Sequence, residues 1–134
     1  MSRFSEKGYV TKENAPIYLT EDMERTAEWF ETVLGWYSNI VEKDGNGKGC
    51  YGVVFDNLPE VEFVHIAPFT GFQMFLGQPQ KNTISFMQVN DVAALYAYVK
   101  HKGWDAITEV VVQPWGGKTC SITTIDGYVI DVFE

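Results

Sequence analysis

The sequence predicts an α+β fold made of two copies of one βαβββ module, which form a cupped mixed sheet with the helices on its outer face. The prediction depends on matches between the two halves of the chain. Each half has a predicted strand that leads to an aspartate, Asp22 or Asp91, and an amphipathic stretch follows each aspartate. Each stretch ends at a Gly-Trp pair, Gly35-Trp36 or Gly103-Trp104. One such match has little weight, but these occur in the same order.

A third match lies further along each half. It is the pattern Gly-Lys-x-Cys, followed after five further residues by an aspartate. The aspartate is Asp56 in the first half and Asp126 in the second. It stands in the same place relative to the amphipathic stretch in both halves. Three matches in one register indicate a duplication and not a chance similarity.

Local patterns give both halves the same element order. Apolar residues recur at helical spacing over Asp22–Leu34, where Thr20 or Asp22 can cap the helix, and over Asp91–Lys102. The strands expected in the first half are Asn14–Leu19, Tyr37–Glu42, Cys50–Phe55 and Phe72–Gly77, with Val61–Ala67 as an insertion or a strand extension. Those expected in the second half are Thr83–Val89, Asp105–Val112, Lys118–Ile125 and Tyr128–Phe133.

We expect one domain over residues 1–134, with an N-terminal arm at 1–12, module one at 13–78 and module two at 82–134. The helix of each module would cover one face of its sheet. The other faces, set edge to edge, would form a cup that can hold a ligand.

Composition narrows the classes of partner. The formal net charge is −8, and an acidic chain is repelled by phosphate backbones, so we expect no nucleic-acid partner. Apolar runs are too short for a membrane helix, and the N-terminus lacks the apolar run of a signal peptide, so we expect no membrane partner and a cytoplasmic location. The two cysteines, Cys50 and Cys120, are expected to be reduced strand residues.

These motifs resemble the vicinal oxygen chelate superfamily of glyoxalases, bleomycin-resistance proteins and extradiol dioxygenases. The resemblance covers about residues 14–134. The segments that carry it are Leu19–Asp22, Leu34-Gly35, Val89–Asp91, Trp115-Gly116-Gly117 and Asp126–Asp131. It implies the two-module fold and a small-molecule site in the cup.

The resemblance also implies where a metal would be held, because metal-using members take ligands from the first and last strands of each module. Those positions correspond here to Asn14, Phe75, Ile84 and Asp131. Zinc, nickel and iron(II) require three or four good ligands, and Phe75 and Ile84 supply none. We therefore expect no metal and no other cofactor. Members of the family can hold a divalent metal, but these positions do not support one.

Strand alternation predicts which side chains line the cup. It places Ile17 toward the helix, and Tyr18, Ile84 and Gln73 toward the cup. The residues that we predict to bind a ligand are Tyr18, Phe75, Phe86, Gln88 and Asp131, with Trp115 added because its loop borders the pocket in the family. Aromatic rings and a carboxylate suit a flat or cationic organic ligand. The alternative is that the aromatic side chains fill a closed core.

Two residues are candidates for catalysis. Asp131, in an aromatic cup, is a candidate base or cation anchor, and the alternative is a structural role with a partner such as Gln88 or Asn14. His65 lies in the apolar run Val61–Ala67; it is either a core imidazole or, if it faces the cup, a general base.

Three functions remain open. The first is metal-free binding of a small, flat or cationic organic molecule. The second is a lyase or isomerase reaction of the glyoxalase type on a small-molecule substrate, and the third is a sensory or interaction domain. Aromatic residues expected at the surface, Trp29, Trp36 and Tyr37, are compatible with a homodimer.

Overall fold

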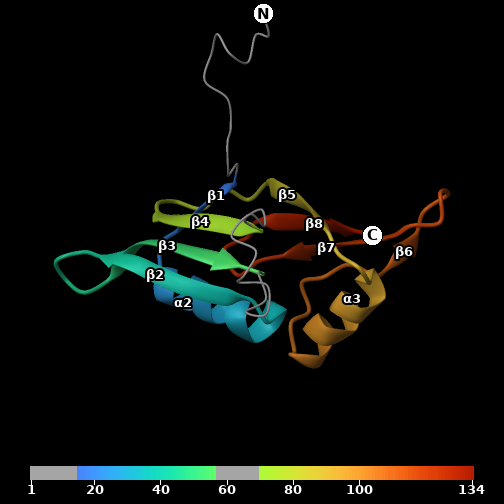
Figure 1. Ribbon diagram of the computed structural model, residues 1–134, viewed down its shortest axis with the longest axis horizontal. Helices are drawn as coiled ribbons and strands as arrows, with labels where there is room; N and C mark the ends of the chain where they lie inside the picture. The colour runs from blue at the N-terminus through green and yellow to red at the C-terminus, as the bar shows by residue number, and fades with distance from the viewer. Residues whose placement is uncertain (1–14, 57–69) are drawn as a thin grey trace, which may run out of the picture.

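The computed structural model describes residues 15–56 and 70–134, which form two four-stranded sheets and two helices on one side of them (Figure 1). The elements of the first half are β1 (Ile17–Thr20), α2 (Met23–Trp29), the π-helical turn η1 (Phe30–Leu34), β2 (Tyr37–Lys43), β3 (Gly49–Phe55) and β4 (Gly71–Leu76). Those of the second half are β5 (Thr83–Gln88), α3 (Val92–His101), β6 (Val111–Val112), β7 (Lys118–Thr123) and β8 (Val129–Phe133).

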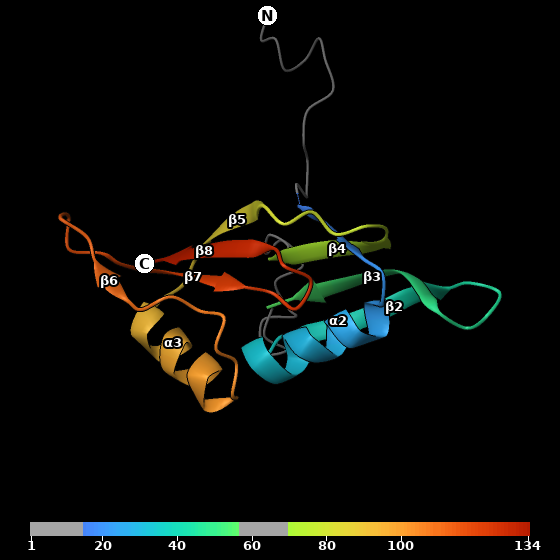
Figure 2. The ribbon, with the colours of Figure 1, turned by 180° about the vertical axis from the view of Figure 1, so that it is seen from behind.

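Both halves have the same topology. The strand order is β1-β4-β3-β2 in the first sheet and β5-β8-β7-β6 in the second. The first strand of each half runs parallel to the last, and the other neighbours are antiparallel. Seen from the front and from behind, α2 and α3 lie under the same side of the sheets (Figures 1 and 2). The predicted α+β fold of two βαβββ modules is confirmed.

The helices begin and end where the sequence predicts. Asp22 and Asp91 are the N-caps, and their carboxylates accept hydrogen bonds from Arg25 N at 3.1 Å and Ala94 N at 3.0 Å. Gly35 adopts the left-handed conformation, with φ of 72°, that ends the first helix. No helix within residues 15–56 and 70–134 has the length and apolar character needed to span a membrane.

One predicted strand is mostly absent. Of Asp105–Val112, only Val111–Val112 pairs with β7, and Ile107 adds an isolated bridge to Ile122. The physical reason is a tight turn in which Ile107 N donates to Asp105 O at 2.8 Å. Beyond the bridge, Ser121 N is bonded to Thr108 Oγ1 at 2.8 Å, and the chain has one more residue than β7 between Ile107 and Val111, so the pairing is interrupted there. Val61–Ala67 and the N-terminal arm lie outside the described residues.

The face assignment of the first strand is wrong. Ile17 is 58% exposed, whereas Tyr18 is fully buried and packs against Phe30, Phe72 and Tyr128 at ring-centroid distances of 5.5, 6.0 and 4.5 Å. Alternation by hydropathy fails here because a tyrosine can be buried when its hydroxyl has partners. In β4 and β8 the side chains that alternate with the open face, Phe72, Met74, Ile130 and Val132, are buried.

Two further exposure predictions are wrong. Trp29 and Trp36 are buried in the core, and Trp29 packs edge-on against Trp104 at 5.2 Å. Ile84, expected in the cup, packs partly buried against the core. The reason is a register shift between Thr83 and Ser85, where β5 pairs with β8. Tyr37 is at the surface, as expected.

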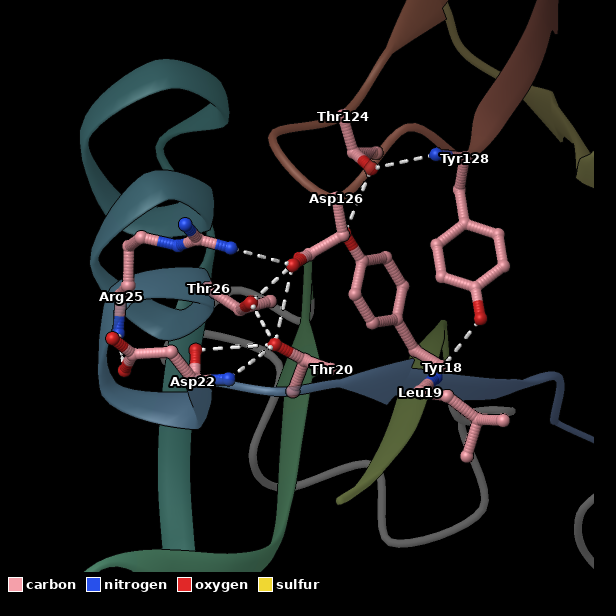
Figure 3. A network of polar contacts seen from close by, with 9 residues as sticks. All are labelled: Tyr18, Leu19, Thr20, Asp22, Arg25, Thr26, Thr124, Asp126 and Tyr128. Carbon is pink, nitrogen blue, oxygen red and sulfur yellow. Dashed lines mark hydrogen bonds and ion pairs between the residues drawn. The ribbon is translucent and has the colours of Figure 1, made fainter. Parts of the chain in front are cut away.

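A buried carboxylate joins the two modules (Figure 3). Asp126 lies in the turn between β7 and β8, and its side chain has no exposed surface. Its oxygens accept hydrogen bonds from Tyr18 Oη at 2.7 Å, Thr26 Oγ1 at 2.6 Å and Thr20 Oγ1 at 3.2 Å. The half-exposed Arg25 adds an ion pair at 3.0 Å. All four donors belong to β1 or α2 of the other module.

A second layer of contacts supports this carboxylate. Thr124 Oγ1 lies 2.7 Å from Tyr18 Oη, and Tyr128 Oη accepts from Leu19 N at 3.2 Å. Burial raises the pKa of Tyr18 well above its ordinary value, so the phenol stays protonated and can donate to Asp126. The turn of the second module is therefore bonded to the first strand and helix of the first.

We expect Asp126→Asn to lower the free energy of unfolding by about 2–4 kcal/mol, because donors arranged around a carboxylate lose a charged acceptor inside the protein. Urea denaturation followed by tryptophan fluorescence measures the change. Asp105→Asn is the control: this carboxylate forms an ion pair with Lys100 at the surface, so its loss should scarcely move the midpoint. Equal, small effects of both substitutions would contradict a structural role for the buried network.

Candidate functional site

A groove of about 740 Å³ lies on the open face of the second sheet, opposite α3. Its side chains come from β5, β7, β8 and the segment before β7. The lining residues are Phe86, Thr108, Glu109, Val111, Trp115, Thr119, Cys120, Ser121, Asp131, Val132 and Phe133. Three residues predicted from the sequence, Phe86, Trp115 and Asp131, are therefore brought together. We call this the acidic aromatic groove.

Strand register places the central side chains. Phe86 of β5 pairs with Asp131 of β8, which in turn pairs with Ser121 of β7. Paired residues project to the same face of a sheet, so these three form a row across it. Asp131 Oδ1 accepts a hydrogen bond from Ser121 Oγ at 2.6 Å. Among the described residues, Oδ2 has no partner and is available to a ligand.

Two aromatic side chains of the groove are exposed to a degree that folding alone does not explain. Phe86 is 77% exposed and Trp115 is 73% exposed. Trp115 stands at the tip of the turn between β6 and β7, where Gly116 has φ of 94° and its N donates to Gln113 O at 2.8 Å. Large exposed rings around a hollow are typical of binding surfaces.

The electrostatic character of the groove is acidic. Glu109 joins Asp131 in the lining, and no lysine, arginine or histidine is among the residues that form it. Glu109 Oε1 accepts from Tyr96 Oη at 3.1 Å, which orients the carboxylate. Sequence analysis missed Glu109, because the regular strand expected over Asp105–Val112 does not form there. Its negative charge was the one feature of the sequence that could have indicated a role in binding a cation.

The chemistry of Cys120 does not add a nucleophile. This residue is buried where β7 forms the floor of the groove. Burial raises the pKa of its thiol, so it is protonated at neutral pH. Cys50 is the other free cysteine and lies in β3 of the first sheet.

The remaining predicted residues lie elsewhere. Phe75 is on the open face of the first sheet, in ring contact with Tyr51 at 5.0 Å. Gln88 lines a separate hollow of about 520 Å³ that shares Phe86 with the groove. Tyr18 is in the core, where a ligand cannot reach it in this conformation. His65 lies outside the described residues.

The strand register allows a test of whether a metal would fit. Asp131 pairs with Ser121 as Phe75 pairs with Tyr51, so Asp131 and Phe75 are equivalent in the two modules. The first strands place Phe86 opposite Asp131 and Leu19 opposite Phe75. One carboxylate among three apolar side chains does not fit a zinc, nickel or iron(II) ion.

The described parts of the chain contain no group of three or more His, Cys, Asp or Glu side chains that could hold a metal ion. Asn14 lies outside these parts, and Ile84 contacts the core. That the chain binds no metal remains a prediction.

The chain is similar to known proteins of one family. Residues 15–77 match the model of the bleomycin resistance protein domain. The crystal structure of a glyoxalase-related enzyme from Clostridium phytofermentans is 48% identical, with a TM-score of 0.86, over 96% of this chain and 98% of that one. A search of curated proteins gives no match.

More distant structures share the fold. A bleomycin-binding protein complexed with bleomycin is 17% identical with a TM-score of 0.65, over 92% of this chain and 98% of that one. A bleomycin-binding protein from bleomycin-producing Streptomyces verticillus, complexed with copper(II)-bleomycin, is 13% identical with a TM-score of 0.65, over 92% and 96%.

We expect protein purified without added metal to contain far less than one equivalent of nickel, zinc, iron or manganese, because two of the four ligand positions implied by the family carry Phe75 and Ile84, which offer no donor atom. Mass spectrometry of the elements in the pure protein measures this. Dialysis against EDTA should leave the unfolding temperature unchanged. One tightly held equivalent, with a lower unfolding temperature after EDTA, would show that the chain has a metal site.

Proposed function

Because the chain belongs to the vicinal oxygen chelate superfamily, among its glyoxalase and bleomycin-resistance proteins, we propose that it binds a small, flat, cationic organic molecule in the acidic aromatic groove. The observation that carries the proposal is the placing of two exposed aromatic rings, Phe86 and Trp115, around the carboxylate of Asp131. Such a groove offers faces for stacking and a negative charge for pairing.

The interactions available are of the right size for reversible binding. A cation over an aromatic face gains about 0.5–2 kcal/mol, and a stacked ring pair gains about 0.5–1.5 kcal/mol beyond the area that it buries. Asp131 keeps one oxygen for a charge-assisted hydrogen bond, and Ser121 fixes its orientation. Glu109 adds a second negative charge, and the lining has no cation that would compete. Together these favour a cationic over an anionic ligand.

The relatives support the same class of function. Two proteins with this fold are described as bleomycin-binding and were solved with bleomycin or its copper(II) form. They are too distant to transfer their ligand to this chain, but they show that the fold serves for binding as well as for catalysis.

A second candidate is a lyase or isomerase reaction of the glyoxalase type. The relative that is 48% identical is described as a glyoxalase-related enzyme, which favours it. Without the family metal, Asp131 would have to act alone as the base, with Ser121 as its partner. Binding and catalysis would use the same groove, so the two functions differ in whether the bound molecule is changed.

We expect ethidium, a planar aromatic cation, to bind the protein in calorimetric titration, and Asp131→Asn to weaken it about tenfold, or about 1.4 kcal/mol. Phenanthridine has the same ring system without the fixed charge, so Asp131→Asn should leave its weaker binding unchanged. Phe86→Ala should weaken both probes, since it removes a stacking face.

Asp105→Asn, an exposed carboxylate outside the groove, is the control for net charge and should leave both probes unaffected. Recovery of the unaltered probe by chromatography separates binding from catalysis. Binding of neither probe, or equal weakening by Asp131→Asn and Asp105→Asn, would overturn the proposal.

We also propose that the protein is a homodimer. Apolar side chains outside the acidic aromatic groove stand exposed, with Ile17 on the open side of the first sheet and Val112 on the edge strand β6 of the second. A second copy would cover such a surface and remove it from water.

Light scattering after size-exclusion chromatography should therefore give twice the 15.2 kDa mass of the chain. Replacing Val112 by aspartate should shift the protein toward the mass of a single chain, because a charge would be buried in the contact. A wild-type protein that is monomeric at micromolar concentration would contradict the proposed dimer. It would not bear on the proposal that the groove binds a ligand.

A further inference from the structure

The exposed ring of Trp115 lies against the backbone of its own turn. A Cβ atom placed on Gly117 would lie 2.7 Å from Trp115 Nε1 and 3.1 Å from Trp115 Cδ1. Both distances are shorter than the ordinary contact between a side chain and a ring, so the indole occupies the space that a side chain at position 117 would need. From this position the indole lines the acidic aromatic groove.

The conformation of the turn does not require a glycine at position 117. The left-handed residue of the turn is Gly116, and Gly117 itself lies outside that region of φ. Gly116 N donates to Gln113 O, and Gln113 N donates to Gly117 O, both at 2.8 Å. These two bonds close the turn through backbone atoms alone, so they set no limit on the side chain at position 117.

The turn between β2 and β3 shows that a long side chain fits at the corresponding position. There Gly47 N donates to Asp44 O at 3.0 Å, and Asp44 N donates to Lys48 O at 2.8 Å. The hydrogen bonds have the same pattern as in the second turn, with Lys48 in the place of Gly117. The residue before the left-handed glycine is Asn46 in the first turn and a tryptophan in the second. The glycine at position 117 therefore accompanies the tryptophan and not the turn.

An indole that is already in place favours the binding of a flat ring. Pro114 precedes Trp115 in the turn and has a fixed φ, so the main chain that carries the indole has little freedom. The indole is 73% exposed, so packing in the core does not hold it. A free side chain would lose rotamer freedom when a ligand stacks on it, whereas one that is already placed avoids that loss.

We infer that Gly117 is a positioning residue of the acidic aromatic groove, because the absence of a side chain there lets the Trp115 indole stand as a fixed stacking face. The added Cβ would also lie 3.2 Å from Glu134 O, which belongs to the main chain. The exposed indole is therefore the group that a side chain would displace. This inference rests on the proposed function, and it concerns a residue that is not among those that line the groove.

The test is a double-mutant cycle on ethidium binding, with Gly117→Ala and Trp115→Ala made singly and together. Gly117→Ala should weaken ethidium binding about fivefold in the wild-type background, as the loss of one stacking face would give. It should have no effect where Trp115 is already replaced by alanine. Gly45→Ala is the matched control, because Gly45 lies in the first turn, outside the left-handed region, with no atom within 4 Å of its Cβ position. It should leave ethidium binding unchanged.

A measurement without ligand tests the position of the ring itself. In nuclear Overhauser spectra the indole protons of Trp115 should show contacts to the α-protons of Gly117, and Gly117→Ala should remove the contact to position 117. The unfolding midpoint of Gly117→Ala should stay close to that of the wild type, since the displaced ring is at the surface. Absence of the contact in wild-type protein would overturn the inference.

The outcomes separate the role of Gly117 from the proposed function. Ethidium binding that depends on Asp131 and is unchanged by Gly117→Ala would overturn the role of Gly117 and leave the groove. Equal weakening by Gly117→Ala in both backgrounds would do the same, because the alanine would then act without the indole. A wild-type protein that does not bind ethidium would overturn the proposed function and this role together.

Discussion

The buried carboxylate of Asp126 is the contact on which the arrangement of the two modules depends. Removing an ionised carboxylate from water costs several kcal/mol, and only a full set of donors offsets it. Here three hydroxyls and one guanidinium supply them, and all come from the first module. The turn between β7 and β8 is thereby held against β1 and α2. The strand β5 also lies beside the first module, where Phe86 and Trp36 line one hollow of about 520 Å³.

The duplicated modules have kept their topology and diverged on their open faces. At equivalent positions the first sheet has Tyr51 paired with Phe75, and the second has Ser121 paired with Asp131. The first pair is a contact between rings, whereas the second is a hydroxyl that orients a carboxylate. In this row the polar groups that could bind a ligand are therefore on the second sheet. In the same row the first sheet offers apolar side chains, Leu19 and Phe75, beside the ring of Tyr51.

Much of the fold could be predicted because it depends on local rules. The caps Asp22 and Asp91 and the positive φ of Gly35 are properties of short segments, and the repeat supplied the topology. The burial of Tyr18 could not be predicted, since its partners Thr124 and Asp126 are distant in the sequence and meet it only in the folded chain. The sequence marked Asp126 as the last residue of the repeated pattern, and nothing local showed that its side chain faces the other module. Of the predicted binding residues, Phe86, Trp115 and Asp131 share one groove because strand alternation held in β8 and in the part of β5 after the register shift, whereas the face assignment failed in β1.

The most direct test of the account is a crystal structure of the protein with a planar aromatic cation bound. The account predicts the ring system against Phe86 and Trp115 on the open face of the second sheet, with a cationic group within about 3 Å of the carboxylate of Asp131, as a charge-assisted hydrogen bond requires. Ligand density on the first sheet beside Phe75 and Tyr51, or at any place where the ligand does not contact Asp131, would contradict it.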